Sequence, residues 1–253
     1  MWIKNHGVPL KSKIKIFKNH IFLINQDNRI LALSINNGSV IWDIRSISSF
    51  IKTQSLLSVA ISKKGDVVIS NSSGDLIKAN SLNGDISWAL NSLGNMLDET
   101  DFFKSSDIVI ENDSIYFSTK SSLFSYRLDT GFTNWEVNVN SVSAPVISGK
   151  KIFTVSDSGF FIILNSEDGK IISSTNILKI LKMKKQSTKI SGFVMGSGKI
   201  YSVTLNGYLI ISSASTGKVE SFKKIGNFIS TNPIIYDGKL FIYVDDSKIL
   251  GFK

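Results

Sequence analysis

Few residues of this chain are able to do covalent or acid–base chemistry. The 253 residues contain no cysteine and only two histidines, His6 and His20. A nucleophile–histidine–acid arrangement would have to use one of these two. His20 follows Lys18 and Asn19 in a predicted hairpin turn, which favours an exposed turn residue over a general base. The missing cysteines also exclude disulfides, thiolate catalysis and zinc–thiolate sites within these residues.

The acidic side chains occur in segments with the composition of turns. Asp245 and Asp246 are adjacent, and Asp66 and Asp75 each follow a glycine. Aspartate stabilises turns by bonding to the nearby backbone, so these positions are explained without a metal. We therefore predict that the chain is not an enzyme and has no catalytic residue, no metal site and no cofactor.

The net charge of +9 comes from lysine rather than arginine. Of the 29 basic residues 26 are lysine, and arginine, the residue suited to bidentate phosphate and base contacts, occurs only three times. No aromatic stacking platform is interleaved with the cations, so we expect no nucleic-acid partner. The lysines at 179, 182, 184, 185 and 189 form one local cluster, interpreted as a solvated loop or a docking patch for an acidic partner. No apolar run is long enough to cross a bilayer, and residues 1–5 lack the pattern of a signal peptide.

Glycine and tryptophan recur together at a fixed spacing, and this repeat predicts the elements of the fold. A glycine is followed four residues later by tryptophan in three copies and by serine in two degraded copies. The pairs are Gly38 and Trp42, Gly84 and Trp88, Gly131 and Trp135, Gly169 and Ser173, and Gly217 and Ser221. Successive glycines are 46, 47, 38 and 48 residues apart. A repeat of roughly 40–50 residues built from short strands is typical of a propeller blade.

Short runs of β-branched and aromatic residues fill each repeat. Examples are residues 152–155, 160–164, 208–211 and 240–244, each bounded by Gly, Asp, Asn or Ser. Such runs predict antiparallel strands joined by hairpins. The residue before each repeat glycine is Asn, Asp or Thr, whose side chain is expected to bond the local backbone while the glycine takes a positive φ. Residues 177–185 allow either a short helix or a strand between blades.

Tryptophan suits the outer strand of a blade, because neighbouring blades splay apart there and a large flat ring fills the gap. We therefore predict a structural docking role for Trp42, Trp88 and Trp135, each buried between adjacent blades. Gly38, Gly84 and Gly131 are expected to let backbone and ring approach closely. The copies that end in Ser173 and Ser221 are expected to have looser outer edges.

The sequence thus predicts an all-β fold, a β-propeller of four-stranded antiparallel blades with six blades in this chain. We expect a single domain over residues 1–253. Residues 232–253 supply only three strands, whereas residues 2–4 have the pattern of a fourth. The N-terminal strand is therefore expected to complete the last blade by pairing with the strand around residues 248–252.

The segment from Arg29 to Trp42 resembles the repeat of PQQ-like, or quinoprotein-type, β-propellers. Within that superfamily the chain is most similar, over essentially its whole length, to the BamB family of outer-membrane β-barrel assembly lipoproteins. Members of that family have eight blades, which leaves open that this chain is the C-terminal part of an eight-bladed propeller. The resemblance implies a monomeric, non-catalytic protein-interaction scaffold in the periplasm, associated only indirectly with the outer membrane.

The resemblance also implies a partner, the POTRA domains of a BamA-like outer-membrane assembly protein. The family makes its contacts through loops between blades, which correspond here to residues 46–54 and 91–101. The partner-binding residues carried over are Phe50, Ile51 and Lys52 in the first loop, with lysine where the family has arginine, and Asp98 and Asp101 in the second. A degenerate quinoprotein-type dehydrogenase, or a propeller that binds a polyanion or another ligand, is the alternative.

Overall fold

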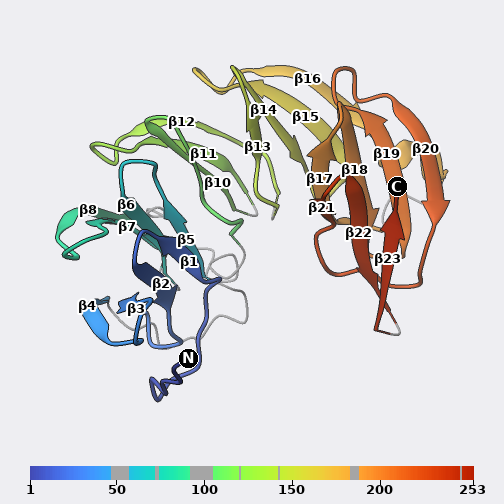
Figure 1. The fold of residues 1–253 in the computed structure, drawn as a ribbon. Coiled ribbons are helices and arrows are strands. Elements are labelled where there is room, and N and C mark those ends of the chain that lie inside the picture. Colours follow the sequence, from blue (N-terminus) through green and yellow to red (C-terminus); the bar gives the residue numbers. More distant parts are fainter. Residues whose placement is uncertain are drawn as a thin grey trace. The chain divides into compact units, whose positions relative to one another are not determined.

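The computed structural model of this chain describes residues 1–46, 57–71, 74–91, 105–119, 121–141, 143–182, 188–245 and 247–253. Within them the chain forms six antiparallel sheets and one short 3-10 helix, η1 (Leu178–Leu181) (Figure 1). Five sheets have four strands and the last has three. The predicted all-β propeller fold with six blades is therefore confirmed. The described residues contain no helix with the length and apolar character needed to cross a membrane.

Each sheet takes its strands in chain order, so neighbouring strands are joined by hairpins. The first sheet consists of β1 (Lys15–Phe17), β2 (His20–Ile24), β3 (Arg29–Ser34) and β4 (Val40–Arg45). The second consists of β5 (Ser58–Ile61), β6 (Asp66–Ser70), β7 (Asp75–Asn80) and β8 (Ile86–Asn91). The third consists of β9 (Val109–Glu111), β10 (Ser114–Ser118), β11 (Leu123–Arg127) and β12 (Thr133–Val137).

The remaining three sheets repeat this arrangement. The fourth consists of β13 (Val146–Ser148), β14 (Lys151–Val155), β15 (Phe160–Asn165) and β16 (Ile171–Asn176). The fifth consists of β17 (Ile190–Gly196), β18 (Lys199–Thr204), β19 (Tyr208–Ser213) and β20 (Val219–Lys224). The sixth consists of β21 (Ile234–Tyr236), β22 (Lys239–Val244) and β23 (Lys248–Phe252).

The chain divides into two compact units. One comprises Met1–Phe117 and Phe124–Asn134, and the other comprises Ser118–Leu123 and Trp135–Lys253. The expectation of one domain over residues 1–253 stays a prediction.

Strands in the middle of a sheet carry buried apolar side chains on both faces. In β3, Ile30 and Ala32 belong to one buried cluster, while Leu31 and Leu33 belong to another. This alternation follows from the two-residue period of a strand, which sends successive side chains to opposite faces. A strand buried on both faces therefore reads as a continuous apolar run in the sequence.

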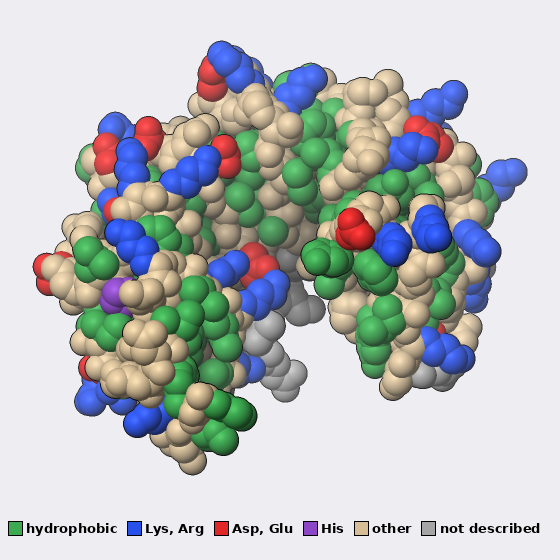
Figure 2. Space-filling view, in the orientation of Figure 1, with side chains coloured by type: hydrophobic (Ala, Val, Ile, Leu, Met, Phe, Trp, Pro, Cys, Tyr) green, Lys and Arg blue, Asp and Glu red, His purple; other side chains and the backbone are tan. Residues whose placement is uncertain are grey.

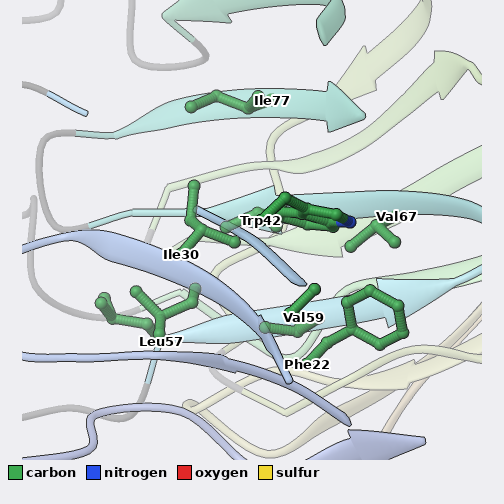
Figure 3. Packing of buried hydrophobic residues seen from close by; sticks show 10 residues of the cluster. Phe22, Ile30, Trp42, Leu57, Val59, Val67 and Ile77 are labelled. Atoms are coloured by element: carbon green, nitrogen blue, oxygen red, sulfur yellow. The ribbon is translucent and has the colours of Figure 1, made fainter. Parts of the chain in front are cut away.

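The core of the first unit lies between its sheets. Phe22, Ile30 and Trp42 of the first sheet pack against Val59 and Val67 of the second, with the indole in the middle of the cluster (Figure 3). A separate cluster joins the second and third sheets and includes Val68, Leu76, Ile115 and Phe117. Burial of these side chains is the main favourable contribution to sheet stacking.

The second unit is built in the same way. Phe153 and Phe161 of the fourth sheet pack with Ile200 and Ile210 of the fifth. On the other side of the fifth sheet, Val203 and Leu209 pack with Leu240, Ile242 and Val244 of the sixth.

The glycine turns connect the third strand of a sheet with its outer strand. Gly38 has a φ of +67° and donates its N–H to the carbonyl of Ser34. Asn37, just before it, accepts the N–H of Ser39 on its side-chain oxygen at 3.0 Å. The same bond, from the N–H two residues on, is accepted by Asn83, Thr130, Asp168 and Thr216. The predicted turn chemistry is confirmed in all five copies.

Two predicted segments differ from a regular strand. Residues 2–4 lie in no strand, and the sixth sheet has three strands, so the predicted completion of that sheet by the N-terminus stays a prediction. In the segment 177–185, residues 178–181 form η1, which favours the helical alternative in its 3-10 form.

Candidate functional site

Each tryptophan docks on the glycine turn of the next sheet along the chain, rather than on its own turn. The Nε1 of Trp42 in β4 donates to the carbonyl of Ser81 at 3.0 Å, three residues before Gly84. A Cβ at Gly84 would lie 2.8 Å from the Trp42 ring, so this position requires glycine for close approach as well as for its φ of +78°. Trp42 is 8% exposed. The Trp42 ring thus lies against the Gly84 turn, and the structural docking role predicted for the two residues stays a prediction.

The junction repeats with the same offsets. Trp88 donates to the carbonyl of Leu128, three residues before Gly131, and Trp135 donates to the carbonyl of Ser166, three residues before Gly169, each at 3.1 Å. Trp135 is buried, whereas Trp88 is half-buried. The acceptor residue is itself held in place, because the N–H groups of Ser81, Leu128 and Ser166 donate to the preceding hairpin.

Trp2 makes the same contact, which the sequence analysis missed. Its Nε1 donates to the carbonyl of Ile35 at 2.9 Å, three residues before Gly38, and a Cβ at Gly38 would meet its ring. All four tryptophans of the chain therefore occupy equivalent junctions. The signal was the tryptophan itself, since the other three tryptophans of the sequence all belong to the glycine–tryptophan repeat.

The fifth glycine turn, at Gly217, has no tryptophan ring packed against it. Ser173 stands in the tryptophan position, and a Cβ at Gly217 would lie 2.8 Å from Thr175 and 3.0 Å from the Phe161 ring. Phe161 is 1% exposed. The Phe161 and Thr175 side chains thus lie beside this glycine, where other junctions have an indole. The expected looser edge at Ser173 stays a prediction.

The predicted partner-binding residues lie outside the described residues. Phe50, Ile51 and Lys52 belong to residues 47–56, and Asp98 and Asp101 belong to residues 92–104. Their role stays a prediction. The described chain on either side of these two loops shows where the loops begin and end.

The ends of the two loops are joined by hydrogen bonds within the first unit. The N–H of Ile108, after the second loop, donates to the Ser58 hydroxyl, after the first loop, at 2.7 Å. The N–H of Leu57 donates to the carbonyl of Lys11 at 2.6 Å. The ammonium of Lys13 pairs with Asp107 at 2.5 Å. The two loops therefore return to the sheets next to each other.

The beginning of the first loop is also anchored. Ser46 follows β4, and its hydroxyl accepts a hydrogen bond from the Asn71 side-chain amide in the turn between β6 and β7. The side-chain oxygen of Asn71 accepts the N–H of Asp75 at 2.9 Å and so shapes that turn. The first loop thus starts beside this turn.

An ion-pair network lies directly before the first loop. The Nε of Arg29 is 2.7 Å from Oδ2 of Asp43, and the Nε of Arg45 is 3.7 Å from the same oxygen. The Arg29 hydrogen bond holds the pKa of the Asp43 carboxyl below its ordinary value of 3.8, and the charge of Arg45 adds to this. The Arg45 side chain is 79% exposed, so its charge is available at the edge of the loop. Two of the three arginines of the chain meet here, which their spacing in the sequence did not indicate.

The sequence offered His20 and scattered acidic side chains as the candidates for catalysis or metal binding. Among the described residues no group of three His, Asp or Glu side chains is arranged to hold a metal ion. The prediction of His20 as an exposed turn residue is wrong, because His20 opens β2, is half-buried and stacks on Phe22 with 6.0 Å between ring centroids. This residue is packed as part of the sheet.

The basic side chains are dispersed. Figure 2 shows lysine and arginine side chains over the visible surface of each unit, with acidic side chains among them. Several lysines have acidic partners, including Lys150 with Glu167 and Lys199 with Glu220. In both pairs the carboxylate raises the pKa of the lysine above its ordinary value.

Known proteins resemble this chain in sequence. A family model described as outer membrane protein assembly factor BamB matches residues 1–175. The Uncharacterized protein RP232 of Rickettsia prowazekii (strain Madrid E) is 25% identical over 185 residues, which are 69% of this chain and 44% of that protein. The chain thus spans less than half the length of this relative.

Solved structures resemble the fold. BamB from Moraxella catarrhalis has a TM-score of 0.77 and 14% identity, over 99% of this chain and 74% of that one. Quinohemoprotein alcohol dehydrogenase from Comamonas testosteroni has a TM-score of 0.66 and 10% identity, over 97% of this chain and 46% of that one. At such identities the likeness concerns the fold alone.

Proposed function

This chain belongs to the BamB family of PQQ-like β-propeller proteins, and from that membership we propose that it is a non-catalytic interaction scaffold in the machinery that assembles β-barrel proteins into the outer membrane. It works as a monomer in the periplasm and reaches the membrane through its protein partner. The family match carries the proposal, because it covers residues 1–175 and so includes both inter-sheet loops.

The partner proposed is the POTRA region of a BamA-like protein. Phe50 and Ile51 supply an apolar anchor, with Lys52 beside it. Asp98 and Asp101 in the second loop supply acidic groups for a basic patch on the partner. An apolar centre with a charged rim is the arrangement that binding hot spots favour.

Two features of the described residues and one general property of such folds support this proposal. Ser58 and Ile108 bring the ends of the two loops together, so one partner domain is able to touch both loops. Arg45 stands exposed just before the first loop and adds a positive charge to its rim. Function in such folds is expected on loops held by a rigid scaffold.

A pull-down with purified POTRA domains tests the proposal. The test variant carries Phe50→Ala, Ile51→Ala and Asp101→Lys, and we expect it to lose most of the binding of the natural chain. The matched control carries Leu82→Ala and Phe132→Ala, two exposed apolar residues in glycine turns, away from the loop ends. The control is expected to bind like the natural chain. Equal binding by all three proteins would remove these loops from the interface.

The alternative function is that of a quinone-dependent dehydrogenase. It is suggested by the similar fold of the Comamonas enzyme, but the sequence identity of 10% gives it no support. We expect no dye reduction with alcohols or sugars after addition of pyrroloquinoline quinone and calcium. The chain offers no cysteine and only two histidines for such chemistry. Substrate-dependent reduction that needs the quinone would overturn the assignment as a scaffold.

A further inference from the structure

The outer strand of the fifth sheet, β20, is an edge strand whose side chains are nearly all exposed. The sheet has the order β17, β18, β19 and β20, so within the described part of the chain β20 pairs on one side only (Figure 1). Five of its six residues are exposed, and Val219 is half-buried. The outer strands β4 and β12, in contrast, each bury a tryptophan. The strand β20 therefore presents both its edge and its side chains to another molecule.

Three lysines at this strand have no acidic partner among the described residues. They are Lys218, Lys223 and Lys224, and all three are exposed. The Nζ of Lys224 is 5.8 Å from the centroid of the Tyr208 ring. The one acidic residue of the strand, Glu220, is already paired with Lys199 of β18 at 3.0 Å. The edge thus keeps a net positive charge, and Figure 2 shows basic side chains at the surface where Figure 1 draws β20.

The register of β20 places two of these lysines on opposite faces of the sheet. Lys223 lies opposite Leu209, and Lys224 lies opposite Tyr208. Successive residues of a strand point to opposite faces, so the two lysines flank the edge from either side. Phe222 is 47% exposed and shares the face of Lys224. A strand added at this edge would therefore meet two adjacent cations and, beside them, an exposed aromatic ring.

We propose that the outer edge of β20 binds an extended acidic segment of another protein as an added β-strand. Two adjacent carboxylates of that segment lie against Lys223 and Lys224, and an apolar side chain next to them packs on Phe222. The main chain of the segment pairs with the outward N–H and C=O groups of β20. Strand addition takes its affinity from such main-chain bonds and its specificity from the side chains beside them.

The charge of the edge selects this occupant. Lysines on an edge strand oppose pairing with a neutral or basic strand, because like charges directly opposite are unfavourable. An acidic strand removes that cost, since opposite charges across a strand pair stabilise it. Nucleic acid fits the edge less well. The cations here are lysines, which lack the bidentate phosphate contacts of arginine, and a nucleic acid would leave the main-chain groups of β20 without a strand partner.

A labelled peptide tests the strand pairing. The probe is a capped peptide, Thr-Glu-Glu-Val-Thr-Val, of about the usual length of a strand, and fluorescence anisotropy measures its binding to the full chain. We expect saturable binding that weakens as salt is added. Two further peptides carry N-methyl groups on alternate amides, each along one edge of the strand, and one of them should lose binding because its pairing edge is blocked. No binding of the probe, or equal binding of all three peptides, would overturn the proposal.

Two variants with the same change in net charge locate the site. The test variant carries Lys223→Glu and Lys224→Glu. The control carries Lys151→Glu and Lys239→Glu, at exposed lysines of β14 and β22. We expect the test variant to bind the peptide about tenfold more weakly or worse, and the control to bind like the natural chain. Equal loss in both variants, or no loss in the test variant, would overturn the proposal.

A single-stranded oligonucleotide of similar charge separates the two classes of polyanion. We expect it to bind more weakly than the peptide. Tighter binding of the oligonucleotide, lost in the same test variant, would assign the edge to nucleic acid and overturn the proposal. None of these measurements involves the POTRA domains, so their result is independent of the proposed function.

Discussion

The indole of Trp2 and the carbonyl of Ile35 are separated by 2.9 Å and 33 positions in the sequence, and they form the same junction as Trp42 and Ser81. In both cases the ring covers a turn glycine and the Nε1 bonds a carbonyl three residues before that glycine. Each junction therefore has two parts. One is the indole of a tryptophan, and the other is a glycine turn with its main-chain carbonyl in the next sheet. These parts make separate contributions to stability, which substitutions can resolve.

Loss of a junction tryptophan should destabilise the protein strongly. We expect Trp42→Ala to lower the free energy of unfolding by about 3–5 kcal/mol, since a buried aromatic side chain is removed. Trp42→Phe should cost about 1–3 kcal/mol, because the buried carbonyl of Ser81 loses its donor. Urea unfolding measures both, with Phe132→Ala, 71% exposed, as a control expected to change little. A loss below about 1 kcal/mol for Trp42→Ala would show that the ring does not hold the sheets together.

A comparison of alanine substitutions at two glycines distinguishes the cost of backbone strain from the cost of contact with the tryptophan ring. Gly84 and Gly149 both have positive φ, +78° and +58°, but a Cβ at Gly149 would meet nothing within 4 Å. Gly149→Ala should therefore cost only about 1–2 kcal/mol for the left-handed backbone. Gly84→Ala should cost clearly more, because the new methyl group meets the Trp42 ring. Equal losses in thermal or urea unfolding would mean that the ring moves aside without cost.

The junction without tryptophan depends on Phe161. We expect Phe161→Ala to lower stability by about 3–5 kcal/mol, and Ser173→Trp alone to give no gain because Phe161 and Thr175 fill the site. In the Phe161→Ala background, Ser173→Trp should recover part of the loss. A double-mutant cycle measures this coupling. Additive effects of the two substitutions would show that the two rings do not compete for one place.

The Asp43 network should make stability depend on pH at the acid end. The pKa of Asp43 is lowered in the folded protein by its bond to Arg29, so the ionised carboxylate favours folding. That contribution is complete above the ordinary value of 3.8 and is lost as the pH falls through the lower folded pKa. The stability difference between the natural chain and Asp43→Asn should thus shrink as the pH falls below 3.8. A difference that stays constant between neutral and strongly acidic pH would contradict this.

The local pattern predicted most strands of the fold because strand, turn and repeat signals all lie close together in the sequence. The run at residues 240–244 becomes β22 (Lys239–Val244), and the run at 208–211 becomes β19 (Tyr208–Ser213). Asn37 and Gly38 form the predicted turn, since its bonds join residues two to four apart. Contacts of this kind are predictable because they depend only on residues close together in the sequence.

The contacts between repeats were less predictable. The repeat pattern did not indicate that Trp42 docks one sheet further along, on Gly84, because the spacing to Gly38 is equally regular. Phe161 gave no sign that it replaces a ring missing at Ser173, since the two residues belong to different strands. The meeting of Arg29 with Asp43, likewise, follows from strand pairing rather than from sequence spacing.

The acceptor in every tryptophan junction is a main-chain carbonyl, and this gives the chain wide freedom to change. The residues that supply it are Ile35, Ser81, Leu128 and Ser166, two with a large aliphatic side chain and two with a small hydroxyl. A junction built on a main-chain group places no demand on side-chain identity at that position. Substitution at these positions is thus expected to leave the sheets joined, in keeping with a TM-score of 0.77 at 14% identity to BamB from Moraxella catarrhalis. The loops proposed to meet a partner are therefore free to adapt to it, because the indole junctions and the apolar clusters that join the sheets use other residues.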